Sequence, residues 1–80
     1  MSDIQQRVTQ CFSNVFPDLP ADEIPRASTA SLPAWDSVAH VTLLSSIAEE
    51  FGQPFEIEDY EELVSYPLIV DRIENQARHA

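Results

Sequence analysis

The 80-residue chain has little of what staples, exports or anchors many small proteins. Its single cysteine, Cys11, excludes an internal disulfide and is typical of a reducing compartment. The first residues, MSDIQQRV, lack the basic start and apolar run of a secretory signal. His40, Thr42 and two serines interrupt the most apolar stretch, so we expect no membrane span. The composition predicts one cytoplasmic domain over residues 1–80.

Lysine is absent, and four arginines stand against 14 acids, which gives a formal net charge of −10 at pH 7. This field repels phosphate backbones, so we expect no nucleic-acid partner. It favours partners with basic surfaces. Acids also keep small domains soluble, so charge alone does not indicate a function.

Glycine occurs once, whereas six prolines divide the chain. Apolar residues recur at the helical period over residues 3–16, where Ser2 or Asp3 would cap a helix that ends before Pro17. Residues 17–36 hold four prolines and show no sustained period, which predicts a long loop. The side chains expected to fix this loop to the core are Leu19, Ile24 and Leu32.

The strongest predicted helix covers residues 37–51, with Asp36 or Ser37 as its cap and Gly52 as a left-handed C-terminal residue. Its expected buried stripe comprises Val38, Val41, Leu44, Ala48 and Phe51, widened by Leu43 and Ile47. A short helix is predicted over 58–64, with a solvated acidic start, and a final helix near Pro67. The fold class is therefore all-α: a small four-helix bundle of three main helices and one short helix.

Ser37 lies at the predicted start of a helix, where backbone N–H groups and the helix dipole favour an attached anion such as a phosphate. A serine alone is a poor nucleophile, and a chain of this size offers no evident oxyanion hole. His40, one turn along, either lies near Ser37, tunes recognition by its charge, or is a plain surface residue, which is the favoured interpretation. Chemistry at Ser37 is therefore expected from another enzyme. The Asp-Ser pair alone is typical of an ordinary helix cap.

The surroundings of the pair resemble the acyl carrier protein family. Asp36-Ser37-Val38 opens the apolar helix, and VTLLSSIAEEFG runs to its end. The long Pro-rich first loop, the short acidic third helix and the final PLIVDRIENQ segment also match, so that the resemblance covers about residues 3–76.

The resemblance implies that Ser37 carries a 4'-phosphopantetheine arm, installed from coenzyme A by a phosphopantetheinyl transferase that holds its own magnesium ion. The arm ends in a thiol that carries acyl or aminoacyl groups as thioesters. The carrier is then not an enzyme. It is expected to be a monomer that presents cargo to a loading enzyme and to downstream acyl-transfer enzymes.

Trp35 stands where most fatty-acid carriers have glycine, and WDS followed by His40 is similar to stand-alone carriers of specialised-metabolite or cell-surface glycan pathways. Trp35 either folds back on Ala39 or His40 as a hydrophobic staple or anchors the loop in the core. Ala39 and Thr42 replace the acids that fatty-acid partners bind. The expected partner surface comprises Asp36, Val38, Ala39, Val41 and Thr42, and further acids that would share in recognition are Asp22, Glu23, Glu58, Glu61 and Glu62.

The interior of the bundle and the remaining reactive side chains allow further expectations. The bundle either shelters an acyl chain or is a plain packed core, with candidate lining residues Val41, Leu44, Ile47, Phe55, Leu63 and Ile69. Cys11, His40 and His79 lack zinc-ligand spacing, so no metal site is expected, and Cys11 is predicted to pack as a small apolar residue. The alternatives to this carrier are a carrier of fatty acid synthesis, an unmodified acidic interaction module, and a hydrolase that uses Ser37 and His40.

Overall fold

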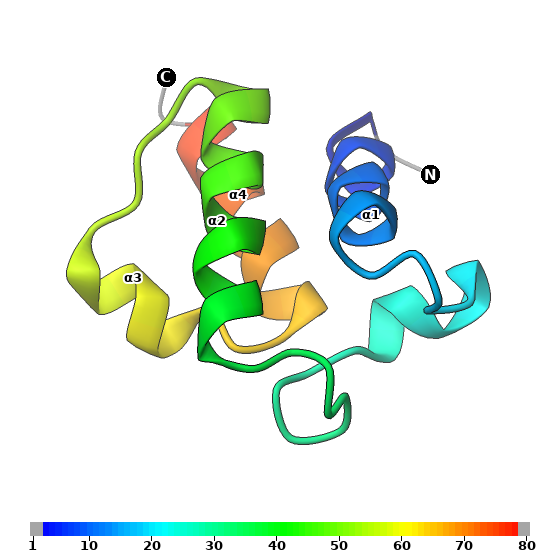
Figure 1. Cartoon of the computed structure of the whole chain (residues 1–80). Helices are drawn as coiled ribbons and strands as arrows, with labels where there is room; N and C mark the ends of the chain where they lie inside the picture. Colours follow the sequence, from blue (N-terminus) through cyan, green and yellow to red (C-terminus); the bar gives the residue numbers. More distant parts are fainter. Residues whose placement is uncertain (1–2, 79–80) are drawn as a thin grey trace.

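The computed structural model describes the backbone of residues 3–78 and the side chains of residues 3–76. Its helices are α1 (Asp3–Val15), the 3-10 helix η1 (Ala21–Arg26), α2 (Ser37–Phe51), α3 (Ile57–Glu62) and α4 (Tyr66–Arg78) (Figure 1). Over residues 3–78 no strand forms, and none of these helices has the length and apolarity to cross a membrane. The predicted all-α fold is confirmed. Ser2 and His79 lie outside the described residues.

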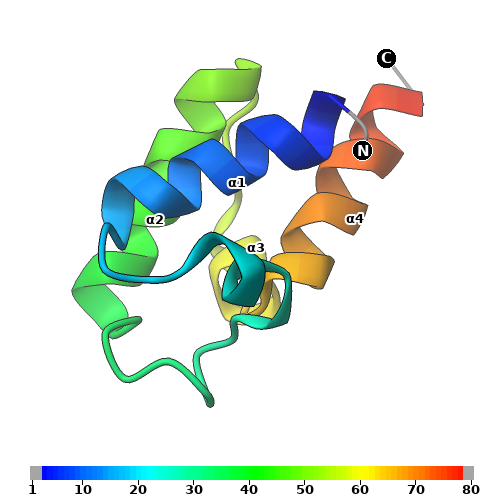
Figure 2. The ribbon, with the colours of Figure 1, turned by 90° about the vertical axis from the view of Figure 1, so that its right-hand side faces the viewer.

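Helix α1 packs against both α2 and α4, and η1 fills the space between the ends of α1 and α4. Helix α3 lies beside α2, at the lower left of Figure 1, and is also joined to α4 by Arg72. Figure 2 shows α1 crossing in front of α2, with α4 on its other side. The start of α2 therefore lies at one end of the molecule, next to the loop that precedes it.

An aromatic cluster occupies the centre of the core. Phe12 is fully buried, and its ring meets Trp35 and Tyr66 edge-on at centroid distances of 5.3 and 5.4 Å. Edge-on pairs of this kind are favoured by the ring quadrupoles. Because Trp35 belongs to the loop before α2, the cluster fixes that loop to α1 directly and to α4 through Phe12.

Helix α2 has the predicted bounds, and Gly52 ends it with φ 66°, a left-handed conformation that glycine adopts without a Cβ penalty. The predicted buried stripe is partly wrong. Val38 and Val41 remain 76% and 52% exposed, whereas Leu43, Leu44 and Ile47 are fully buried. Apolar residues on α2 fit the helical period along two overlapping stripes, one through Val38 and Val41 and one through Leu43 and Ile47. Packing against α1 buries the second stripe.

The long predicted loop contains η1, which the sequence did not indicate. Pro20 precedes η1 and Pro25 lies inside it, where the tighter 3-10 turns tolerate the missing N–H groups. Ile24 is fully buried in η1, and Leu19 and Leu32 are half-buried against the core, as predicted. The loop is then pinned by an isolated antiparallel bridge between Ser28 and Ser65.

Two of the four arginines join helices to one another. Arg7 of α1 donates from Nε to Glu50 Oε2 at 2.7 Å and lies 4.3 Å from the centroid of the Phe51 ring. Arg72 of α4 binds Asp59 and, at 3.1 Å, Glu62 of α3. In a chain without lysine, these cations stabilise the ends of α2 and α3 against their neighbours.

Helix α3 begins at Ile57, one residue before the predicted start, because Glu56 and Asp59 form a capping box. The Glu56 N–H donates to Asp59 Oδ2 at 2.8 Å. The expectation of a solvated acidic start is wrong for Asp59, which is only 7% exposed and is paired with Arg72. The other acids of this segment, Glu58, Glu61 and Glu62, are exposed as expected.

The candidate lining of an internal shelter is mostly packed core. Leu44, Ile47, Leu63 and Ile69 are 0–3% exposed, and Phe55 is half-buried. Val41 points to solvent and does not belong to this set. Cys11 is buried at 4% exposure, as predicted for a small apolar residue.

Candidate functional site

The candidate site is the first turn of α2 together with the loop that leads into it. Asp36 precedes the helix in an extended conformation, and its Oδ1 accepts a hydrogen bond from the Ala39 N–H at 2.9 Å. The Asp36 carbonyl accepts from the His40 N–H at 2.8 Å, which starts the helical ladder. Asp36 is therefore the cap, and Ser37 is the first residue of the helix.

Ser37 is exposed, and its side chain makes no hydrogen bond to any other residue in the described range. Because Asp36 caps the helix, the Ser37 hydroxyl is not required for that role. The N–H groups of Ser37 and Val38 precede the first bond of the helical ladder and remain at the positive end of the helix dipole. The arrangement combines a reachable hydroxyl with a backbone that favours an anion beside it.

A shallow hollow of about 240 Å³ opens beside Ser37 and is lined by Thr29, Trp35, Asp36, Ser37 and His40. Its floor is rigid, because the loop residue Trp35 is held in the core at 3% exposure. The Trp35 ring contacts Phe12 on α1 and Phe16 just after its end, at centroid distances of 5.3 and 6.0 Å. The two interpretations of Trp35 are thus compatible, since it is a core residue that also packs on His40.

His40 is not the plain surface residue that the sequence favoured. Its Nδ1 accepts a hydrogen bond from Trp35 Nε1 at 2.9 Å, and its Nε2 lies 2.6 Å from the carbonyl oxygen of Tyr60 on α3. The His40 and Tyr60 rings also meet edge-on at 6.1 Å. The contact with Trp35 was anticipated, but no signal in the sequence indicates the contacts with Tyr60, which is 20 residues away. Both ring nitrogens are occupied, so neither is free to take a proton from Ser37.

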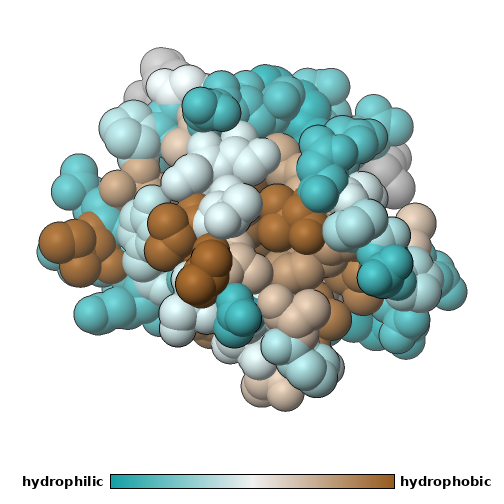
Figure 3. Space-filling view, viewed as in Figure 1, coloured by the Kyte–Doolittle hydropathy of each residue, from teal (hydrophilic) through white to brown (hydrophobic). Residues whose placement is uncertain are grey.

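The residues proposed to meet partners do not share one face. Val38, Val41 and Thr42 are exposed on the outer side of α2, where the Thr42 hydroxyl donates to the Val38 carbonyl at 3.1 Å. Figure 3 shows apolar surface over the lower part of α2 and over α3, and the exposed large apolar residues on these helices are Val38, Val41 and Ile57. Ala39 instead is half-buried and turns toward α1.

The acids near the far end of α2 differ from one another. Glu50 is bound by Arg7, whose terminal nitrogen also donates to the Glu50 carbonyl at 2.6 Å. Glu49 is exposed without such a partner in the described residues. Within that same range no cluster of three or more His, Cys, Asp or Glu side chains has the arrangement of a metal site.

Comparisons with protein-family models, with curated proteins and with solved structures gave no match to this chain. The resemblance to acyl carrier proteins therefore depends on the residues alone.

Proposed function

We propose that this protein is a stand-alone acyl or peptidyl carrier that bears a 4'-phosphopantetheine arm on Ser37. The observation that carries the proposal is the exposed, unbonded Ser37 hydroxyl at the first position of α2, with the cap supplied by Asp36. A serine that served only as a cap would direct its oxygen at the backbone. This one is left available to a modifying enzyme.

The residues at the α2 start fit a phosphodiester. In the modification, Ser37 Oγ loses its proton and bonds to the phosphorus that bears the pantetheine, and the bond from that phosphorus to the nucleotide half of coenzyme A breaks. The diester would then lie beside the Ser37 and Val38 N–H groups, at the positive end of the helix dipole. The arm supplies a terminal thiol that holds cargo as a thioester.

The carrier role fits the rest of the surface. A net charge of −10 steers basic partners toward the chain, and Val38 and Val41 give α2 an apolar contact surface beside Ser37. Ala39 and Thr42 provide no charge where fatty-acid partners bind acids. This combination favours partners in a specialised-metabolite or surface-glycan pathway over those of bulk fatty acid synthesis. The partners are a phosphopantetheinyl transferase, a loading enzyme and downstream acyl-transfer enzymes, with the carrier as a monomer.

The direct test is intact mass after incubation with coenzyme A and a broad-specificity phosphopantetheinyl transferase. We expect a mass increase of one phosphopantetheine in the native chain and in Ser45→Ala, which removes another exposed serine of α2. Ser37→Ala should show no increase. An unmodified native chain, under conditions that modify a known carrier, would contradict the proposal.

An unmodified interaction module remains the second candidate, favoured by the exposed apolar residues Val38, Val41 and Ile57. It predicts no mass change and tight binding to a partner by both the native chain and Ser37→Ala. A hydrolase that uses Ser37 and His40 would instead react with a serine-directed phosphonate probe. The occupied nitrogens of His40 disfavour it, since a general base needs a free lone pair next to the serine.

A further inference from the structure

A groove of about 500 Å³ opens between the end of α1, the loop after it and the start of α2. Most of its lining is apolar, namely Val15, Phe16, Pro17, Leu19, Pro20, Leu32, Ala34 and Ala39. The volume lies within the range of small-molecule sites, roughly 300–1,000 Å³. The groove is lined by Ala34 and Ala39, which lie on either side of Ser37 in the sequence. An arm attached to Ser37 therefore begins two residues before Ala39, a side chain of the first turn of α2 that lines the groove.

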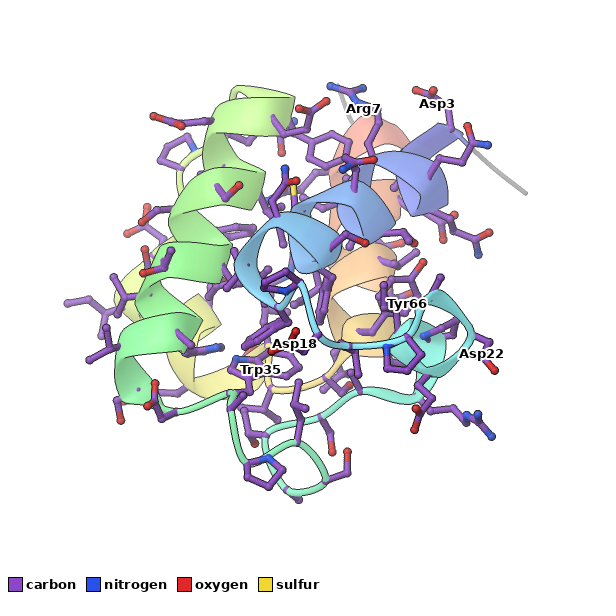
Figure 4. All side chains as sticks on the ribbon, turned by 45° about the vertical axis from the view of Figure 1, so that its right-hand side comes forward. Asp3, Arg7, Asp18, Asp22, Trp35 and Tyr66 are labelled. Atoms are coloured by element: carbon purple, nitrogen blue, oxygen red, sulfur yellow. The ribbon has the colours of Figure 1, made fainter. Side chains whose placement is uncertain are left out.

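The charge of the groove is of one sign. Its two ionisable lining residues are Asp18 and Glu23, both acids and both exposed at the rim. Arg26 lies outside it, in a neighbouring hollow of about 200 Å³ that shares Leu19, Glu23 and Leu32 with the groove. In Figure 4, Asp18 lies below the end of α1, whereas Asp22 lies at the outer edge of η1.

We propose that this groove receives the cargo of the arm, and that the cargo is an aminoacyl group with an apolar side chain and a free ammonium. The inference rests on the proposed function. The apolar side chain would displace water from the lining around Leu19 and Leu32. The ammonium would pair with Asp18, assisted by Glu23. A dicarboxylic cargo such as a malonyl-type group would meet two like charges, and a neutral acyl chain would leave both acids without a partner.

Ala39 lines the groove, whereas Val38 and Thr42 are exposed on the outer side of α2. Its small side chain leaves space at the mouth of the groove, and a larger residue there would fill it. The core residues that a bundle-interior shelter would need, such as Leu44 and Ile47, are fully buried and packed. The groove offers apolar contact at the surface without opening the bundle.

The test attaches three stable cargoes to Ser37 from amide-linked coenzyme A analogues: leucyl with a free amine, N-acetyl-leucyl, and hexanoyl. Intact mass verifies attachment, and backbone amide shifts of isotope-labelled protein then report docking. We expect the leucyl cargo to shift the amides of Leu19, Leu32, Ala34 and Ala39, with a docked population about two- to fivefold above that of N-acetyl-leucyl, the size of an exposed ion pair. Ala34→Phe should abolish these shifts, and Ala30→Phe, in the same loop but outside the groove, should retain them.

Two variants with the same loss of charge test whether the cargo ammonium pairs with Asp18. Asp18→Asn should bring the leucyl cargo down to the N-acetyl level, whereas Asp22→Asn, with the same loss of charge outside the groove, should not. Shifts confined to residues beside Ser37, or equal or larger shifts from hexanoyl, would overturn the inference and leave the carrier function standing. Failure of attachment in the native chain would overturn the carrier function and this inference with it.

Discussion

The indole N–H of Trp35 donates to Nδ1 of His40 at 2.9 Å, across the cap of α2. An indole nitrogen only donates, so Nδ1 is the unprotonated acceptor. The Tyr60 carbonyl only accepts, so Nε2 of His40, 2.6 Å away, carries the proton. The Nε2–H tautomer of His40 thus links the loop before Ser37 to α3, which gives the start of α2 a fixed orientation.

A double-mutant cycle tests this link. Trp35→Phe keeps an aromatic ring but leaves Nδ1 of His40 without its donor, and we expect the free energy of unfolding to fall by about 1–3 kcal/mol. His40→Phe should cost a similar amount, because it leaves the indole N–H and the Tyr60 carbonyl unpaired. The double variant should be less destabilised than the sum, with a coupling of about 0.5–3 kcal/mol from urea unfolding.

Nitrogen chemical shifts of the His40 ring provide an independent check of the tautomer. A protonated Nε2 and an unprotonated Nδ1 are expected at neutral pH. Strict additivity in the cycle, or the opposite tautomer, would show that the Trp35–His40 contact does not form in solution.

The Asp59–Arg72 pair predicts a pH dependence of stability. Burial raises the pKa of Asp59, but the Glu56 N–H and the Arg72 guanidinium outweigh it and hold that pKa below its usual value. A carboxyl with a lowered folded-state pKa stabilises the fold above its unfolded-state pKa of about 3.9. That contribution is lost as the pH falls through the lower folded-state pKa.

Asp59→Asn should therefore lower the free energy of unfolding at neutral pH by about 1–3 kcal/mol, since Arg72 and the Glu56 N–H lose a charged acceptor. The variant should also lose part of the fall in stability that we expect for the native chain as the pH drops from the unfolded-state pKa of Asp59 through its lower folded-state pKa. Urea unfolding across this range measures both. Glu61→Gln, an exposed carboxyl on the same helix, is the control and should change neither by much.

The bounds of α2 were predictable because local signals determine them, an Asp cap at one end and Gly52 at the other. The buried face was not, since Val38 and Val41 fit the helical period as well as Leu43 and Ile47 do. Only contact with α1 decides between these sets. The roles of His40 and Asp59 were also hidden from the sequence. Their partners are the Tyr60 carbonyl and Arg72, 20 and 13 residues away, and come from other helices.

Cys11 provides a probe of how tightly α1 is held. Burial raises the pKa of its thiol, which lowers the fraction of reactive thiolate. We expect a disulfide reagent such as dithionitrobenzoate to label native protein on the order of 100-fold more slowly than the urea-unfolded chain at the same pH, because labelling requires local opening. Equal rates would show that α1 is not packed against α2 in solution. Arg7→Ala, which removes the contacts to Glu50 and Phe51, should accelerate labelling of the native state.

Acids introduced at Ala39 and Thr42 should make this chain more acceptable to fatty-acid partner enzymes. Both positions are in the first two turns of α2, and Thr42 is exposed. We expect Ala39→Glu with Thr42→Glu to raise the affinity for a basic fatty-acid partner about two- to tenfold, from one ion pair at the exposed Thr42 position and one at the half-buried Ala39 position. Surface charge pairs are screened by salt, so the gain should shrink as ionic strength rises.

Gln10→Glu with Asn14→Asp adds the same charge on the exposed side of α1 and serves as the control. If the control matches the α2 variant, long-range charge alone sets the affinity, and if neither binds better, recognition by these partners does not depend on acids at the start of α2.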